Sequence, residues 1–307
     1  MGWLTAAIVT YALYSILPAI IFWPVIIAFI AFLWRFTSTG MSVRQKIAIS
    51  TWSAQSDSNI YTKLEIDCTN LLKYIKKYRD TTGKKVTATH VISKAVAHTI
   101  KTMPRFNGRI LWGRYLPKKT ADISILATVE GGDNLVGVTI SDLDNKSMDA
   151  FIDEMTAHVT KLRAGKDKDF NKSVNLARLL PTFLLRPVVH MGGFLASAVG
   201  LDLSAVGIKR FPFGTVVVTN MGSMGIDEAY APFSPFFHTP CVILVGAISD
   251  KVVAHEGEIV IRPRMNLNVT LDHRYLDGFQ AAKLGKLIRK YVEDPETLEA
   301  ISDKKSQ

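Results

Sequence analysis

The sequence predicts an α/β fold, a sandwich in which a β-sheet is flanked by helices, behind an apolar N-terminal segment. Three observations carry this prediction. Apolar and polar residues alternate between positions 265 and 272, which predicts a strand with one buried face. Residues 279–291 then carry apolar side chains at helical spacing, until Pro295 stops the pattern. Residues 1–34 contain no Lys, Arg, Asp or Glu.

The N-terminal apolar run is long enough to cross a bilayer, which takes about 20 residues. Pro18 and Pro24 interrupt it, so the alternatives are a tilted or kinked transmembrane helix and a re-entrant hairpin. The first charge, Arg35, and the bases after it place the following domain on the cytoplasmic side of a bacterial inner membrane, or its organellar equivalent. We therefore expect a membrane anchor over residues 1–36 and one domain over 37–307.

From position 42 onward, strand and helix patterns alternate. The predicted elements are, in order, a strand over 60–66, a helix beginning at 67 or 69, a helix over 87–103, strands near 111–115, over 123–129 and over 135–140, and a helix over 149–163. The Gly-Gly-Asp-Asn run at 131–134 predicts a hairpin turn between the last two strands.

Residues 173–213 form an apolar and basic insertion between these elements and the next predicted strand. Its first part has a helical apolar stripe up to a break at Arg186-Pro187, and residues 188–203 form a second apolar stretch. Neither part is long enough to cross a bilayer comfortably. We favour helices lying in a membrane interface, with Lys209 and Arg210 toward the headgroups; the alternative is a helical pair packed on the globular core or on a neighbouring subunit.

The C-terminal part contains the residues most suited to chemistry. A strand pattern over 214–220 ends in Thr219-Asn220-Met221-Gly222, and the strand over 265–272 ends at His273. Asp277 and Gly278 follow, just before the helical pattern begins. One interpretation makes Asp277 a helix N-cap and His273 an ordinary loop residue; the other makes His273 a catalytic base held at the end of a strand.

Five further blocks, together with H-x-x-x-D-G at His273, resemble the CoA-dependent acyltransferase fold. This fold is shared by chloramphenicol acetyltransferase and the catalytic core of 2-oxo acid dehydrogenase acyltransferases. The blocks lie in the family's order at 44–48 (RQKIA), 64–72 (LEIDCTNLL), 87–97 (TATHVISKAVA), 121–126 (ADISIL) and 240–246 (PCVILVG). The resemblance covers roughly 43–172 and 213–300 and implies a mixed β-sheet flanked by helices.

The resemblance also implies roles for individual residues. His273 would be the general base, and the Thr219 hydroxyl would stabilise the oxyanion of the tetrahedral intermediate. Asp277 would orient the site through an arginine, matched here to Arg44, while Asn220 and Gly278 belong to the supporting motifs. The chain departs from the family at 49–51, where Ile-Ser-Thr replaces the usual Arg-Met pair.

Composition narrows the possible ligands. The net charge of +10 comes from scattered basic residues without a nucleic-acid motif, so we expect no nucleic acid and favour a membrane surface or the anionic coenzyme A. Cys68 and Cys241 both lie in strand patterns and form no metal cluster with nearby histidines, so no metal is expected.

The sequence thus predicts a membrane-anchored acyltransferase that moves an acyl group between CoA and an acceptor thiol or hydroxyl. The resemblance implies a homotrimer whose active site lies between subunits, with His273 and Thr219 from neighbouring chains. We expect no lipoyl domain before the core and any lipoyl or acyl carrier to come from another protein, and a membrane lipid is the favoured acceptor. The alternatives are a dehydrogenase-type acyltransferase with separate lipoyl carriers and a non-catalytic trimeric scaffold of a membrane complex.

Overall fold

The computed structural model divides the chain into two compact units, Met1–Ser42 and Val43–Gln307. It describes residues 21, 23–29, 58–129, 134–179, 182–233 and 238–298. In the first unit, residues 23–29 are helical. Most of the predicted anchor, together with Arg44, positions 49–51 and the turn at 131–133, lies outside the described residues.

Among the helices that the structure describes, none combines the length and the apolar character that a bilayer crossing needs.

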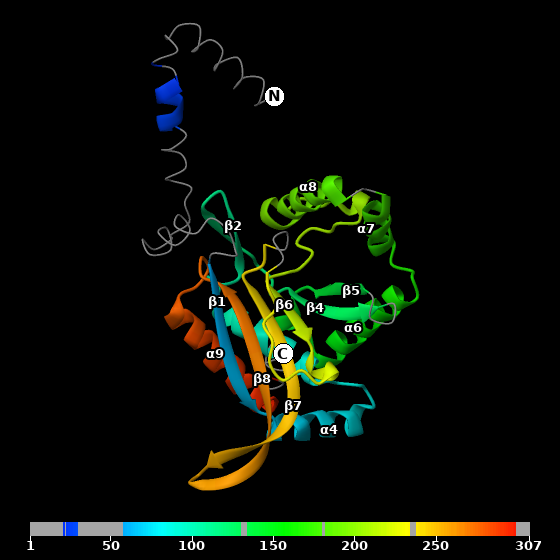
Figure 1. Cartoon of the computed structure of the whole chain (residues 1–307), viewed down its shortest axis with the longest axis vertical. Helices are drawn as coiled ribbons and strands as arrows, with labels where there is room; N and C mark the ends of the chain where they lie inside the picture. The colour runs from blue at the N-terminus through cyan, green and yellow to red at the C-terminus, as the bar shows by residue number, and fades with distance from the viewer. Residues whose placement is uncertain are drawn as a thin grey trace. The chain divides into compact units, whose positions relative to one another are not determined.

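The second unit is built on a six-stranded mixed sheet, as expected (Figure 1). Its strands follow the order β1 (Asn59–Asp67), β8 (Glu258–Asp272), β7 (Cys241–His255), β6 (Val216–Asn220), β4 (Ile123–Val129) and β5 (Asn134–Ile140). β6 is parallel to both β4 and β7, and the remaining pairs are antiparallel. A separate two-stranded ribbon joins β2 (Gly108–Leu111) to β3 (Arg114–Pro117).

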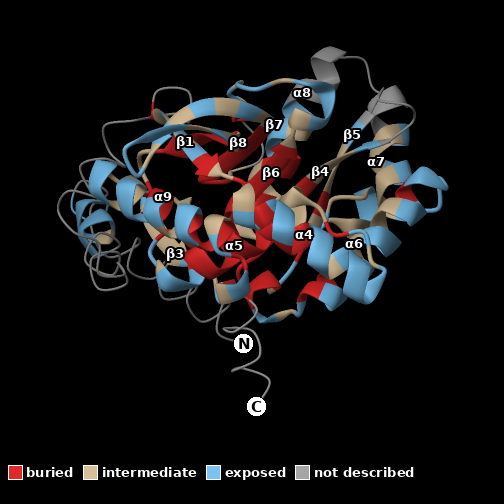
Figure 2. Cartoon of the chain, turned by 90° about the horizontal axis from the view of Figure 1, so that it is seen from below, coloured by how far each residue is buried: buried red, intermediate tan, exposed pale blue. Residues whose placement is uncertain are grey.

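Four helices supply the other half of the core: α4 (Thr69–Thr82), α5 (Ala88–Thr102), α6 (Met148–Arg163) and α9 (Gly278–Glu293). α5 is the inner helix, and every residue from Val91 to Ile100 is buried. Figure 2 shows the buried residues gathered along β6, β7, β8 and α5. Local signals explain the ends of the helices: Thr87 caps the start of α5, and Gly83, in the left-handed conformation, ends α4.

β7 and β8 extend well beyond the predicted strands into a long hairpin, whose turn lies at Glu256 and Gly257. One face of its outer part is apolar and uncovered: Val252, Ile259 and Ile261 are 71%, 81% and 71% exposed. An apolar strand face in water is unfavourable, and it marks a surface suited to association.

The insertion forms α7 (Lys168–Leu179), α8 (Thr182–Gly193) and a π-helical turn, η3 (Phe194–Val199). The predicted break at Arg186-Pro187 is wrong, because Pro187 lies inside α8. Proline lacks one backbone donor but does not always end a helix, and here one weakened turn is tolerated. α8 continues directly into η3, and Gly200, which has φ +83°, ends that π-helical turn.

The described end of the insertion packs on the globular domain, as the alternative predicted. η3 lies against β2, and the backbone N–H of Phe211 donates to the carbonyl of Ala196 at 3.3 Å. Lys209 pairs with Asp169 of α7 at 3.3 Å. Val188, Met191 and Leu201 remain exposed. The side chains of residues 176–186, which carry the first apolar stripe, lie outside the described part.

Candidate active site

His273 begins the loop between β8 and α9, and the backbone on both sides of it is fixed. Its N–H donates to the carbonyl of Ser58 at 2.8 Å, and the N–H of Asp272 donates to the carbonyl of Pro240 at 3.0 Å. The side chain is half-buried, with its Nδ1 atom shielded from solvent. The imidazole is therefore held at the sheet end formed by the beginnings of β1, β6 and β7.

A buried ion pair organises this loop. The guanidinium of Arg274 binds both carboxylate oxygens of the fully buried Asp272, with an Nη2–Oδ2 distance of 2.6 Å and an Nε–Oδ1 distance of 3.0 Å. The Ser58 hydroxyl also donates to Oδ1, at 2.9 Å. Burial alone lowers the pKa of Arg274, but the bonds to Asp272 outweigh it, so the pKa is raised. Sequence analysis missed this pair, although the acid and base flanking His273 were a visible signal.

Tyr275 ties the same loop to the small ribbon. Its hydroxyl accepts a hydrogen bond from the backbone N–H of Ile110 in β2 at 3.1 Å, and its ring packs edge-on against Tyr115. Burial raises the pKa of the phenol, so the hydroxyl stays protonated at physiological pH. Asp272, His273 and Tyr275 thus each bond to a distant segment, and Arg274 bonds to Asp272, which leaves His273 little conformational freedom.

The other residues of the motif have structural partners. Asp277 is the N-cap of α9: its carboxylate accepts from the N–H of Gln280 at 3.0 Å, and Gly278 is the first helical residue. The predicted N-cap role of Asp277 is therefore confirmed, while the role of His273 stays a prediction. The expected partner of Asp277, Arg44, lies outside the described residues. Asn220 donates from Nδ2 to the Thr89 hydroxyl at 2.8 Å, which joins the end of β6 to the start of α5.

Thr219 lies near the C-terminal end of β6, well along the sheet from His273. It is in register with Leu244 of β7, which is in register with Asn268 of β8, five residues before His273. At the usual strand spacings, Thr219 and His273 are roughly 20 Å apart within one chain. The Thr219 hydroxyl makes no hydrogen bond to any residue that the structure describes, and the side chain is 9% exposed. One copy of the chain does not bring the two predicted catalytic side chains together.

The insertion approaches the His273 loop through His238, a residue outside the motifs that the sequence analysis identified. The ring of Phe194 in η3 lies 6.2 Å from the His238 ring. Burial lowers the pKa of His238, and the positive charge of Arg274 and the nearby His190 lowers it further. No local pattern signals this contact, because residues about forty positions apart make it.

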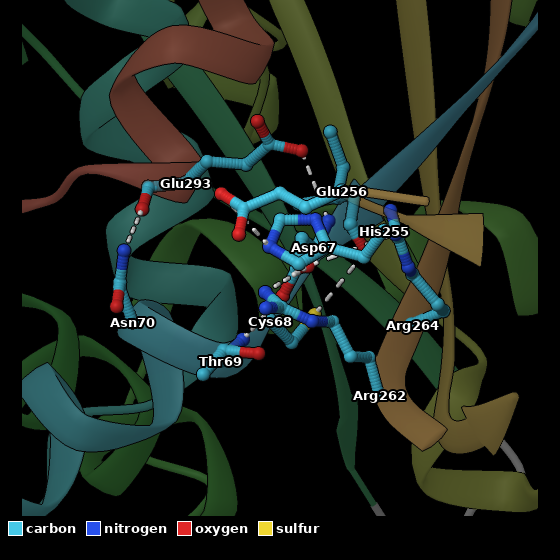
Figure 3. Close-up of polar contacts among 10 residues, drawn as sticks. Asp67, Cys68, Thr69, Asn70, His255, Glu256, Arg262, Arg264 and Glu293 are labelled. Carbon is cyan, nitrogen blue, oxygen red and sulfur yellow. Dashed lines mark hydrogen bonds and ion pairs between the residues drawn. The ribbon is translucent and has the colours of Figure 1, made fainter. Parts of the chain in front are cut away.

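A second polar cluster lies at the far end of β1, where the hairpin leaves the sheet (Figure 3). The Asp67 carboxylate accepts a hydrogen bond from Arg262 at 3.1 Å and pairs with Arg264 at 3.6 Å. The backbone N–H of Asp67 donates to the carboxylate of Glu293 at 3.0 Å. These bonds fasten the hairpin to α4 and α9. Because His273 is paired with the opposite end of β1, this cluster takes no part in the site.

Comparisons with known proteins agree with this geometry. The family model described as "2-oxoacid dehydrogenases acyltransferase (catalytic domain)" matches residues 38–172 and 207–300. The gap between the two matched parts, 173–206, is most of the insertion.

Two curated relatives and one solved structure illustrate the similarity. The acetyltransferase component of the Rhizobium meliloti pyruvate dehydrogenase complex is 25% identical over 69% of this chain and 38% of its own. The lipoamide acyltransferase component of the Bacillus subtilis branched-chain alpha-keto acid dehydrogenase complex is 26% identical over 86% of this chain and 52% of its own. The cubic core of a pyruvate dehydrogenase multienzyme complex has a TM-score of 0.59, at 18% identity over 78% of this chain and 83% of that one. The chain spans about half the length of such curated relatives.

Proposed function

This chain belongs to the family of 2-oxoacid dehydrogenase acyltransferase catalytic domains, and from that premise we propose that it transfers an acyl group between CoA and an acceptor thiol or hydroxyl. The observation that carries the proposal is the position of His273. His273 stands in the motif H-x-x-x-D-G, for which the resemblance to the family implies a general base, on a loop that an ion pair and backbone bonds to distant segments hold in place. A base whose position is fixed before the substrate binds costs no reorganisation during the reaction.

The proposed reaction needs only proton transfer and oxyanion stabilisation. The neutral imidazole of His273 takes the proton of the acceptor thiol or hydroxyl as its sulfur or oxygen attacks the carbonyl carbon of the acyl thioester. Negative charge develops on the carbonyl oxygen, and the Thr219 hydroxyl donates a hydrogen bond to it. The intermediate collapses with cleavage of the bond between carbonyl carbon and CoA sulfur. The CoA thiolate leaves and takes back the proton from the imidazolium.

The active assembly is a homotrimer with sites between subunits. This proposal is supported by the roughly 20 Å of sheet between Thr219 and His273 of one chain, a distance that a hydrogen bond cannot bridge. The uncovered apolar face of the hairpin, with Val252, Ile259 and Ile261, supports association of copies as well. A site completed by the neighbouring copy would explain why the Thr219 hydroxyl has no partner among the described residues of its own chain.

Two acceptors are proposed. The names of the relatives, a dihydrolipoyllysine-residue acetyltransferase and a lipoamide acyltransferase, favour a dihydrolipoyl thiol. Two features favour a membrane lipid instead: the uncharged run over residues 1–34, and the exposed apolar side chains of Val188, Met191 and Leu201 in the insertion. On this alternative the protein lies at the cytoplasmic side of a bacterial inner membrane or its organellar equivalent.

CoA release from acyl-CoA separates these acceptors. The full chain, purified in detergent, is incubated with acetyl-CoA or succinyl-CoA, and then with free dihydrolipoamide or with a membrane lipid extract. We expect release that depends on dihydrolipoamide. Release with the lipid extract alone assigns the second acceptor. An intact trimer that releases no CoA with either acceptor and any acyl-CoA contradicts acyl transfer and leaves the scaffold interpretation.

Mixing of two inactive variants tests the shared site. Thr219→Val and His273→Ala each remove one catalytic group, and we expect each homotrimer to lose about a hundredfold or more in kcat. In trimers refolded from an equal mixture, about a quarter of the interfaces combine the intact threonine of one variant with the intact histidine of the other. Activity should therefore return to about a quarter of wild type. Mixtures as inactive as the two parents would show that each chain builds its own site.

A further inference from the structure

Three cations converge on the single aromatic ring of Phe211, where the insertion rejoins the domain. The guanidinium carbons of Arg109 and Arg210 lie 4.8 and 4.9 Å from the ring centroid, and the Lys118 ammonium lies 4.9 Å from it. Arg109 belongs to β2 and Lys118 directly follows β3, so the β2–β3 ribbon and the insertion meet here. Each cation gains only modestly from the ring, about 0.5–2 kcal/mol, and the three repel one another.

The positive charge of this group, called here the Phe211 cluster, is not neutralised. None of its three cations forms an ion pair with any residue that the structure describes. The Nη1 atom of Arg109 is buried without a hydrogen-bond partner in that part of the chain. Asp122 interacts electrostatically with Lys118 and Asp202 with Arg210, but their carboxylates are bonded to the N–H of Asp142 and to Ser204, and Asp167 and Asp169 line the adjoining cavity.

The pKa values respond to this excess of charge. Burial lowers the pKa of Lys118 to about 8; the nearby Asp122 opposes this shift and Arg109 adds to it. Burial lowers the pKa of Arg109 as well, with a further contribution from Arg210. A negative charge bound nearby would raise the pKa of both cations part of the way back toward its usual value.

The backbone keeps Phe211 in place at a cost. Its φ is +51°, in the left-handed region that bulky residues rarely adopt, and such conformations cost about 1–3 kcal/mol. A Cβ at Gly200 would lie 2.1 Å from Nη1 of Arg109, so this position must be glycine for the guanidinium to fit. Strain of this kind persists mainly where a site requires a particular arrangement.

Room for a ligand adjoins the cluster. A cavity of about 500 Å³ between β5, α6 and α7 is lined by Arg210 and Phe211, and its wall includes the apolar side chains of Leu126, Val138 and Phe213. Cavities of this size accept small organic molecules. The exposed guanidinium of Arg210 stands at the junction of the cavity and the cluster.

We propose that the Phe211 cluster binds the phosphate group of an organic phosphate, with Arg210 as the direct ligand and Arg109 and Lys118 supplying the remaining charge. The carbon part of that molecule extends into the neighbouring cavity. Arginine suits this chemistry because its planar donors match phosphate oxygens. CoA and a phospholipid headgroup are the two sources of such a group, and the binding site does not depend on the acyl transfer proposed for His273.

Sulfate binding by the full chain, measured by equilibrium dialysis with labelled sulfate, tests the site without any catalytic readout. We expect saturable binding that inorganic pyrophosphate displaces. Arg210→Gln should weaken sulfate binding about tenfold or more, the usual value of a charge-assisted hydrogen bond. Lys209→Gln is the matched control, because it removes the same charge from the same cavity wall, at a side chain that pairs with Asp169 and is outside the Phe211 cluster. It should change the affinity less than about twofold.

The pH dependence adds an independent readout. The charge of sulfate does not change between neutral and alkaline pH, so any change in affinity there comes from the protein. Only protonated Lys118 attracts the anion, and its pKa is about 8. Affinity should therefore fall as the pH rises through about 8, both in wild type and in Lys209→Gln. In Lys118→Met, checked for native structure by circular dichroism, this decrease should disappear.

Competition identifies the source of the phosphate. If CoA displaces sulfate and phosphatidylcholine vesicles containing phosphatidic acid do not, the natural ligand is the nucleotide. If the vesicles displace sulfate and CoA does not, the natural ligand is the lipid headgroup. Absence of saturable sulfate binding, or equal effects of Arg210→Gln and Lys209→Gln, overturns the proposal. Because sulfate binding is independent of CoA release, failure of this site and failure of the proposed acyl transfer are separate results.

Discussion

His273→Ala should lower kcat/KM for acyl transfer by about 10²–10⁴-fold, the usual contribution of a positioned general base. The acceptor would then have to lose its proton to water as it attacks the acyl carbonyl. The free energy of unfolding should change little, because the bonds that hold the loop involve the backbone of His273 and the side chains of Asp272 and Tyr275. CoA release with acetyl-CoA and dihydrolipoamide measures the first quantity, and urea denaturation measures the second.

His255→Ala is the matched control for this experiment. His255 lies on the exposed hairpin, far along β7 from the site, and its closest charged partner is Glu256 at 3.8 Å. The substitution removes an identical imidazole and should leave kcat/KM unchanged. If both variants kept the wild-type kcat/KM, His273 would not act as a base in this chain.

Asp272→Ala should destabilise the fold by about 3–5 kcal/mol, the typical cost of removing one partner of a buried ion pair. Asp272 is fully buried and accepts bonds from Arg274 and from the Ser58 hydroxyl. Its loss leaves the Arg274 guanidinium, which is only 16% exposed, without a counter-charge. Total stabilities of domains are about 5–15 kcal/mol, so this change should be evident as a large shift of the urea midpoint.

Two further variants show whether the effect belongs to the ion pair. Asp250→Ala removes the same side chain from an exposed position on the hairpin and should stay within about 0.5 kcal/mol of wild type. Replacing Asp272 and Arg274 together by leucine leaves no unpaired charge and should recover much of the stability lost in Asp272→Ala. If the double variant were as unstable as the sum of the two single ones, the pair would not be the source of the cost.

Regular elements could be predicted because their signals are local. The alternation over 265–272 and the helical spacing after it correspond to the end of β8 and to α9, and the Thr87 cap marks the start of α5. The outer part of the β7–β8 hairpin was missed although it alternates as well. Alternation of apolar and polar residues usually indicates a strand with one buried face. In this hairpin the apolar face is exposed instead.

The candidate site could be predicted only in part. The family motif indicated His273 and Thr219, but it carried no information about Arg274, whose role depends on the ion pair with Asp272. The insertion shows the same limit: its helices follow from its periodicity, whereas Pro187 within α8 and the contact of η3 with β2 do not. Whether an apolar helix face meets lipid or protein depends on its neighbours, and composition alone does not distinguish them.

By itself, the sequence determined the family, the mixed α/β class, most helices and strands, and the histidine at the end of a strand, because residue type and spacing record local structure directly. Only the tertiary structure decided which distant groups meet: Ser58 with Asp272, Ile110 with Tyr275, and Arg109 and Lys118 with Phe211. The physical reason is that a hydrogen bond or ring contact between residues 93 to 214 positions apart leaves no periodic trace in either segment. Such contacts exist only once the sheet has brought the segments together.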